Sequence, residues 1–246
     1  MGRGKLPSYG PAGRGVHSRA DAAYSSVRRT TPQLVAVVAF AVAALICPAE
    51  QPAAAEKTVK VVALGDSLTA GYGLPNKDAF PAQLEQALRA RGIAVEIENA
   101  GVSGDTASGG LSRLDWSVPE GTDAVIVALG ANDMLRGIDP AVTRAALDTI
   151  LQRLKQRGIK ILLAGMQSAR NMGIEYRGAY DAIFPELAAK HDVVFYPFFL
   201  DGVAAQAKFA LADGIHPNSA GVSQIVTKIL PKAEELIARV RSRRGS

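Results

Sequence analysis

The hexapeptide VKVVAL, from Val59 to Leu64, is an almost continuous apolar run, and such a run is typical of a strand buried on both faces of a sheet. Helical patterns separate it from further short apolar runs. These runs are Val95–Ile97, Ala124–Leu129, Ile159–Ala164 and Val193–Tyr196. Strands that alternate with helices predict an α/β fold in three layers, with helices on both faces of a doubly wound, mostly parallel, five-stranded sheet.

Two of the expected helices carry recognisable start signals. Asp78 is expected to cap a helix over residues 79–91. Asp139 followed by Pro140 has the pattern of an N-cap with proline at the first helical position, and this helix should end at Gly158. Each of the two helices lies between two predicted strands, as the crossover connections of a parallel sheet require.

Two more helices are expected in the C-terminal part of the chain, over residues 176–190 and from about Asn218 onward. Pro231 lies inside the last helical pattern and should kink or break that helix, because proline has no backbone N–H to donate. His191 follows the 176–190 helix directly, where a histidine has an ordinary capping or helix-dipole role.

Composition and charge favour one domain and argue against nucleic acid as a partner. The 246 residues are 48% apolar, which suits one compact domain with a real core. Six Lys/Arg against two acidic residues give residues 1–55 a net charge of +4, of the +5 carried by the whole chain. The remainder is therefore close to neutral, and the basic C-terminal residues 241–246 are interpreted as a solvated tail.

The N-terminal residues 1–55 have the pattern of a cleaved signal peptide. Arg28-Arg29 precedes a 14-residue apolar run from Leu34 to Cys47, and Ala53-Ala54-Ala55 offers a cleavage site. The run is shorter than the roughly 20 residues that span a bilayer, so cleavage is favoured over a membrane anchor. The sequence therefore predicts a periplasmic or secreted domain at 56–240, with a true start codon near Val27.

Cysteine and histidine counts limit the chemistry of the predicted domain. Cys47 is the only cysteine, and it lies in the segment expected to be removed, which excludes disulfides and thiolate chemistry. His191 and His216 are the two histidines that remain. No cluster of residues has metal-ligand spacing, so neither a metal nor another cofactor is predicted.

Four short blocks stand out, and the first three follow predicted strands at the carboxyl end of the sheet, where α/β folds place their sites. They are Gly65-Asp66-Ser67-Leu68, then residues 101–106, then residues 130–133, and then Asp213-Gly214-Ile215-His216-Pro217. A serine hydroxyl is a weak nucleophile that needs a base, and the base needs an orienting group. Ser67, His216 and Asp213 are the candidates for these three roles.

Each of these residues also has an ordinary structural interpretation. Ser67 taken alone would be a helix N-cap, and Asp213 would be a turn residue before a glycine. Asn132 with its neighbour Asp133 would be a simple turn after a strand. The order of the four blocks along the chain, rather than any single tripeptide, favours the functional interpretation.

Together the four blocks resemble the GDSL or SGNH hydrolase superfamily, and the resemblance covers residues 58–238. The stretches 65–73 and 99–106 are similar to its bacterial periplasmic arylesterase, lysophospholipase and acyl-CoA thioesterase I group. The resemblance implies a flavodoxin-like sheet and an oxyanion hole formed by the backbone N–H groups of Ser67 and Gly104 and the side-chain amide of Asn132. Asp66 and Asp133 are expected to bind loop backbone instead.

The resemblance also places a substrate loop at Met166–Tyr176, where Ser168-Ala169-Arg170 departs from the proline-containing versions of the family. Four apolar residues are candidates for an acyl groove, although ordinary packing would explain each of them equally well. They are Leu135, Met172, Ile174 and Phe209.

The sequence predicts a serine esterase that hydrolyses carboxylic esters, and thioesters as well, through an acyl-enzyme on Ser67. Its partner would be a small-molecule ester: an aryl ester, a lysophospholipid or an acyl-CoA. A carbohydrate acetylesterase with the same four blocks is one alternative. A non-catalytic ligand-binding domain is another, but a nucleotide-binding glycine loop is absent from the sequence and His216 is retained. The oligomeric state is left open.

Overall fold

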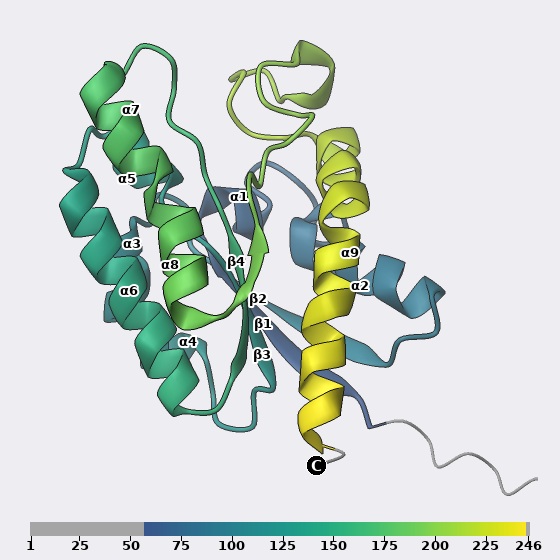
Figure 1. Cartoon of the computed structure of the whole chain (residues 1–246). Helices are drawn as coiled ribbons and strands as arrows, with labels where there is room; N and C mark the ends of the chain where they lie inside the picture. The colour runs from purple at the N-terminus through teal and green to yellow at the C-terminus, as the bar shows by residue number, and fades with distance from the viewer. Residues whose placement is uncertain (1–56, 245–246) are drawn as a thin grey trace, which may run out of the picture. The chain divides into compact units, whose positions relative to one another are not determined.

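The computed structural model describes residues 57–244, in which five strands form one parallel sheet in the order β2-β1-β3-β4-β5 (Figure 1). The strands are β1 Val59–Gly65, β2 Val95–Gly101, β3 Ala124–Ala128, β4 Lys160–Ala164 and β5 Val194–Tyr196. This arrangement confirms the predicted α/β fold. The predicted signal peptide, its start codon and Cys47 lie outside the residues that the structure describes.

Helices cover both faces of the sheet (Figure 1). Helices α2 (Phe80–Ala90) and α9 (Ser219–Arg244) pack together on one face, and α6 (Pro140–Gln156) and α8 (Ile183–His191) pack together on the other. Shorter elements follow the strands or connect the longer helices. These are α1 Ser67–Ala70, η1 Asn76–Asp78, α3 Ala107–Ser112, α4 Leu114–Ser117, α5 Ala131–Leu135, α7 Ile174–Asp181 and η2 Ala207–Phe209.

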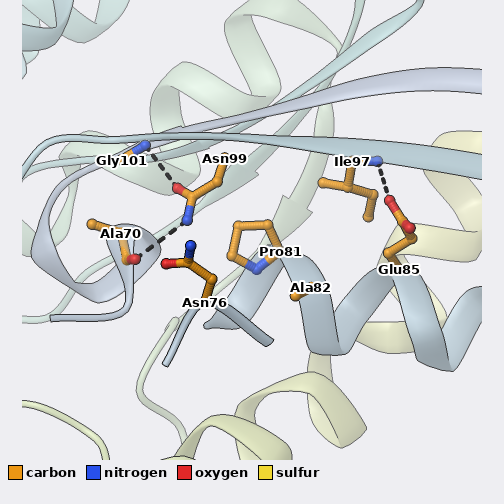
Figure 2. A pocket seen from close by; sticks show the side chains of 8 residues that line it. All are labelled: Ala70, Asn76, Pro81, Ala82, Glu85, Ile97, Asn99 and Gly101. Carbon is orange, nitrogen blue, oxygen red and sulfur yellow. Dashed lines mark hydrogen bonds between the residues drawn. The ribbon is translucent and has the colours of Figure 1, made fainter. Parts of the chain in front are cut away.

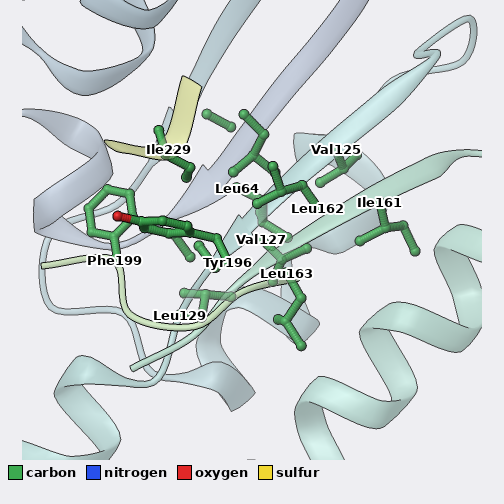
Figure 3. Close-up of a cluster of buried hydrophobic side chains, with 14 of the residues drawn as sticks. Leu64, Val125, Val127, Leu129, Ile161, Leu162, Leu163, Tyr196, Phe199 and Ile229 are labelled. Atoms are coloured by element: carbon green, nitrogen blue, oxygen red, sulfur yellow. The ribbon is translucent and has the colours of Figure 1, made fainter. Parts of the chain in front are cut away.

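The core lies on both sides of the central strands, as the continuous apolar runs predict. Every residue of β3 is buried, and so are the six residues of β1 other than Lys60. Figure 3 shows Val125 and Val127 of β3 beside leucines of β1 and β4. Phe199, which follows β5, and Ile229 of α9 lie in the same cluster. The central strands therefore give the site a rigid base.

Asp78 does not cap the helix that follows it, so this prediction was wrong. Asp78 is the last residue of the 3₁₀ turn η1, and Ala79 is the N-cap of α2, without a side-chain hydrogen bond. Pro81 lies in the first turn of α2, where its missing N–H costs nothing. By contrast, Asp139 caps α6 as predicted, through a hydrogen bond from the backbone N–H of Ala141.

The helix predicted over residues 176–190 is two helices, α7 and α8, with Ala182 between them. Pro185 explains the interruption, because it has no N–H to donate to the carbonyl of Asp181, four residues earlier. Pro231 has the same defect but does not break α9, which continues to Arg244. The residues of α9 on either side of Pro231, including Ile229 and Ala233, are buried against the core.

The outer edge of β2 is covered by polar side chains (Figure 2). The carboxylate of Glu85 on α2 accepts the backbone N–H of Ile97 at 2.6 Å, and Asn99 bridges the N–H of Gly101 and the carbonyl of Ala70. An open cavity of about 530 Å³ lies against these groups. Because the backbone N–H groups of Ile97 and Gly101 already have side-chain partners, this edge of β2 is protected from the addition of another strand.

Within residues 57–244, none of the helices combines the length and apolarity that a membrane crossing would need. The predicted basic tail is helical as far as the structure describes it, since α9 ends at Arg244. Arg243 donates to the carbonyl of Gly158, which joins the end of α9 to the start of β4.

Candidate active site

The first and last of the four blocks meet at the carboxyl edge of the sheet, although they are 149 residues apart in the sequence. Ser67 follows β1 as the first residue of α1. Its hydroxyl Oγ lies 3.0 Å from Nε2 of His216, and Nδ1 of His216 lies 2.6 Å from Oδ2 of Asp213. The three side chains thus form one hydrogen-bonded chain, the arrangement that activates a serine for nucleophilic attack.

Asp213 is held as an ionised carboxylate. Its Oδ1 accepts the backbone N–H groups of His216 and Ile215, and its Oδ2 accepts Nδ1 of His216. The backbone hydrogen bond from His216, then the side-chain hydrogen bond from His216 and the backbone hydrogen bond from Ile215 lower the pKa of Asp213 to about 2. With Nδ1 donating to this carboxylate, Nε2 is left to accept the proton of Ser67.

The loop that carries His216 is fixed by its own backbone. Leu211 donates to the carbonyl of His216 at 2.7 Å and accepts from Gly214, whose φ of +72° suits glycine. Asn218 at the start of α9 donates its side-chain amide to the carbonyls of Lys208 and Ala210. His216 is therefore presented from a short closed loop rather than from an open one.

The second and third blocks are joined by the amide of Asn132. Its Nδ2 donates to the carbonyl of Asp105 at 2.9 Å and to Oδ2 of Asp66 at 3.3 Å. Gly104 has a φ of +87°, and its carbonyl accepts from Arg136 at 2.7 Å. The side-chain amide of Asn132 has two N–H bonds, and both are used. An oxyanion bound here would therefore replace one of the two acceptors. The bond to Asp66 is the longer and weaker one, so Asp66 is the acceptor that would be replaced.

Asp66 and Asp133 lie beneath the site and bind loop backbone, as expected. Asp66 accepts the N–H of Leu68, and Asp133 accepts the N–H of Ala107 and the hydroxyl of Thr143. Burial raises the pKa of Asp66 to about 6, against the lowering effect of its hydrogen bonds. Burial also raises the pKa of Asp133.

Two residues that contact the site were not identified from the sequence. Arg113 is buried and donates to Asp105 at 2.5 Å, to Ser117 at 2.9 Å and to the carbonyl of Gly65 at 2.8 Å. Tyr72 packs its ring against the imidazole of His216. Tyr72 lies in the stretch 65–73 that resembles the family, but its residue type and spacing gave it no role, and no motif contains Arg113. The partners of both residues are brought to them only by the fold.

The four candidate acyl-groove residues fall into two groups. Leu135 and Ile174 are 58% and 86% exposed, at the end of α5 and the start of α7. Met172 and Phe209 are half-buried and pack against the hydrophobic core. A role for any of them in substrate binding stays a prediction.

His191 lies apart from the chemistry suggested by the four blocks. It is the last residue of α8, and its Nε2 lies 2.5 Å from Asp148 of α6, so it has a structural partner. Among residues 57–244 there is no group of three or more His, Cys, Asp or Glu side chains that would hold a metal ion.

Comparison with known proteins identifies the relatives of this arrangement. Residues 63–223 match the GDSL-like Lipase/Acylhydrolase family. The chain is 36% identical to Esterase TesA of Pseudomonas aeruginosa, over 75% of this chain and 91% of that protein. It is 39% identical to Thioesterase 1/protease 1/lysophospholipase L1 of Escherichia coli K12, over 68% of this chain and 78% of that protein.

A solved structure shows the same fold. The esterase AlinE4, of the SGNH-hydrolase family, is 42% identical and superimposes with a TM-score of 0.62, over 73% of this chain and 96% of that one. The fold and the sequence thus point to the same group of proteins.

Proposed function

The chain belongs to the GDSL-like lipase/acylhydrolase family, a family of serine hydrolases that act on ester bonds, and on this premise we propose that it cleaves esters through an acyl-enzyme on Ser67. The observation that carries the proposal is the chain of contacts from Ser67 Oγ to His216 Nε2 at 3.0 Å and from His216 Nδ1 to Asp213 at 2.6 Å. The function is therefore that of a serine esterase.

In the first half of the reaction, Oγ of Ser67 attacks the ester carbonyl carbon while Nε2 of His216 takes the hydroxyl proton. The negative charge moves to the carbonyl oxygen, where the backbone N–H groups of Ser67 and Gly104 and the amide of Asn132 would stabilise it. The C–O bond to the leaving alcohol then breaks, and His216 gives the proton to that alcohol.

In the second half, a water molecule attacks the acyl carbon of the ester formed on Ser67. His216 takes a proton from the water and returns it to Oγ of Ser67 as the acyl bond breaks. Asp213 stays ionised throughout, because its pKa of about 2 lies far below neutral pH. The products are one carboxylic acid, one alcohol and regenerated enzyme.

We propose aryl esters, lysophospholipids and acyl thioesters as the substrate classes. The chain resembles proteins named as an esterase and as a thioesterase and lysophospholipase, which supports this range. The same catalytic groups would also serve a sugar acetate. Acyl-chain length separates these possibilities, because only the lipid-type substrates carry a long apolar tail.

The test is hydrolysis of p-nitrophenyl esters from acetate to long acyl chains by the wild-type protein and by Ser67→Ala. We expect hydrolysis by the wild type and its loss in the variant, since removal of the nucleophile removes the acyl-enzyme route. A Ser67→Ala variant as active as the wild type would refute the proposal. A preference confined to acetate would favour the acetylesterase instead.

Histidine variants provide a matched pair for the same assay. His216→Gln should lose most activity, whereas His191→Gln should keep wild-type kcat, because His191 binds Asp148 and takes no part in the proposed reaction. EDTA should leave the activity of the wild type unchanged. Equal losses in the two variants would refute the assignment of His216 as the base.

We also propose that residues 1–55 direct export and are then removed, which would place the domain in the periplasm or outside the cell. The apolar run from Leu34 to Cys47 before Ala53-Ala54-Ala55 supports this localisation. N-terminal sequencing of the protein from a cell fraction tests it. A protein recovered from the cytoplasm with its N-terminal segment intact would refute it.

A further inference from the structure

The imidazole of His216 has close partners at its edges and an aromatic ring at one face. Asp213 and Ser67 bind the two ring nitrogens. The ring of Tyr72 lies 4.5 Å from the imidazole, centroid to centroid, with 35° between the planes. The side chain of His216 is 20% exposed, while Tyr72 is 52% exposed. Tyr72 therefore covers the histidine without being buried itself.

The backbone around Tyr72 fixes this position relative to the nucleophile. The N–H groups of Gly71 and Tyr72 both donate to the carbonyl of Ser67 at 3.1 Å. Gly71 and Gly73 on either side have φ values of +79° and +72°, which define a tight turn at the end of α1. The turn therefore ties the aromatic ring to the same peptide that carries the nucleophile.

Packing also joins this turn to the loop of His216. A Cβ atom on Gly73 would lie 2.8 Å from the side chain of Leu211, so the two segments are in close contact there. Leu211 in turn donates to the carbonyl of His216. The backbone segments that carry Tyr72 and His216 are thus held close together.

The stacking has a direct consequence for the reaction proposed above. When His216 takes the proton of Ser67, its ring becomes a cation, and a cation over the face of an aromatic ring is attracted by the ring quadrupole. Asp213 stabilises the same cation from the edge of the ring. We propose that Tyr72 is a positioning residue that holds the imidazole of His216 in plane with Ser67 and Asp213 and stabilises its protonated form in the transition state.

The inference rests on the proposed acyl-enzyme function, and it concerns the ring of Tyr72 rather than its hydroxyl. Tyr72→Phe keeps the ring and Tyr72→Trp enlarges it, whereas Tyr72→Leu removes the aromatic face and keeps an apolar side chain. We expect kcat and kcat/KM of Tyr72→Leu to fall together, about fivefold to thirtyfold, for a p-nitrophenyl ester. Tyr72→Phe and Tyr72→Trp should stay within about threefold of wild type.

A second reaction separates positioning from substrate binding. Diethyl p-nitrophenyl phosphate reacts with an activated serine and carries no acyl chain, so its rate of inactivation reports on Ser67 and His216 alone. Tyr72→Leu should slow this inactivation by the same factor as kcat. A rise in KM with unchanged kcat and unchanged inactivation would identify Tyr72 as a substrate contact and overturn the inference.

Two further results would also overturn it: wild-type kcat in Tyr72→Leu, or an equal loss of kcat in Tyr72→Phe. Thermal unfolding of each variant shows whether it is folded at the assay temperature. If Tyr72→Leu is not, the loss of kcat in Tyr72→Phe still decides whether the ring or the hydroxyl matters, and such a loss overturns the inference. Ser67→Ala is measured alongside. If Ser67→Ala stays active, the proposed function fails; if Ser67→Ala is inactive and Tyr72→Leu is unimpaired, only the role of Tyr72 fails.

Discussion

Replacing Arg113 by methionine should be among the most damaging single changes beneath the site. The side chain of Arg113 is 7% exposed and that of its partner Asp105 is 17% exposed, so the ion pair is nearly removed from water. The guanidinium also donates to Ser117 and to the carbonyl of Gly65. Methionine fills similar space but leaves the carboxylate of Asp105 without its guanidinium partner, whereas the carbonyl of Gly65 keeps the backbone N–H of Val102.

The expected loss follows from the unpaired carboxylate of Asp105. Breaking a buried ion pair by removing one partner costs about 3–5 kcal/mol of unfolding free energy. In a domain of this size, 1 kcal/mol shifts the unfolding temperature by roughly 2–4 °C, so Arg113→Met should lower that temperature by roughly 6–20 °C. Urea unfolding with linear extrapolation measures the free energy directly.

Arg153 supplies a matched control. It pairs with Asp115 at the surface, where the two side chains are 39% and 73% exposed, and such pairs contribute about 0–1 kcal/mol. Arg153→Met should therefore be nearly neutral. If Arg113→Met costs no more unfolding free energy than Arg153→Met, the reasoning about the buried pair is wrong.

A second substitution tests the cause of the loss. Replacing Asp105 by leucine in the Arg113→Met background removes the uncompensated carboxylate, so part of the lost stability should return. Activity at a temperature where each variant is folded should still be reduced, because Gly65 and Asp105 flank Ser67 and Gly104 in the chain. A double variant less stable than Arg113→Met would refute the charge argument.

Three further predictions concern other parts of the domain. The raised pKa of Asp66, about 6, means that its ionisation is unfavourable in the folded state, so the wild type should lose stability as pH rises from about 4 to 6. Asp66→Asn should remove this loss. Urea unfolding between pH 4 and 7 measures it, and the same pH dependence of the unfolding free energy in both proteins would contradict it. Glu85→Val should promote self-association, because it uncovers the backbone N–H of Ile97 at the edge of the sheet. Glu96→Val removes an equal charge from the surface of β2 and should leave the protein's association state unchanged. Light scattering compares the two variants. Pro231→Ala should raise the unfolding free energy by about 1–2 kcal/mol because it restores a helix N–H, and an unchanged value in urea would show that α9 has already adapted to the proline.

The strands were predictable because burial on both faces leaves an uninterrupted apolar run. β1, β3 and β4 therefore appear at the predicted positions within one residue. β2 extends four residues beyond the predicted Ile97, because the polar, exposed Glu98 and Asn99 end the apolar run there although the strand continues. An apolar run is the wrong signal for such a strand, so its true length was not visible in the sequence.

The helix errors have a local cause. Asp78 and the 176–190 helix were interpreted from residue types and periodicity, without the tertiary contacts that decide between competing turns. Pro185 was the available signal for the break between α7 and α8, because its missing N–H weakens the turn before it. The prediction that Asp139 caps α6 was correct because Pro140 follows it, and the fixed φ of proline suits the first position of a helix.

Topology explains only part of the candidate site. The first three blocks follow the parallel strands β1, β2 and β3, so their position at one edge of the sheet was predictable. The fourth block lies in the long connection between β5 and α9, and its contact with Ser67 is seen only in the structure. Arg113 and Tyr72 could not be identified in this way. Each acts through a contact that depends on side-chain direction, which neither spacing nor periodicity determines.

The buried polar groups beneath the site explain why the first three blocks have to be considered as one unit. Arg113 links the end of β1 to Asp105 in the second block, and Asp105 accepts through its carbonyl from Asn132 in the third. Asn132 donates back to Asp66 in the first block. Buried polar groups are costly unless they are paired, so each of these residues is held by the others. A substitution that breaks this ring of contacts should therefore reduce stability and also move Gly104, Asn132 or Ser67. For this reason Arg113 should matter for activity, although it is not proposed to touch the substrate.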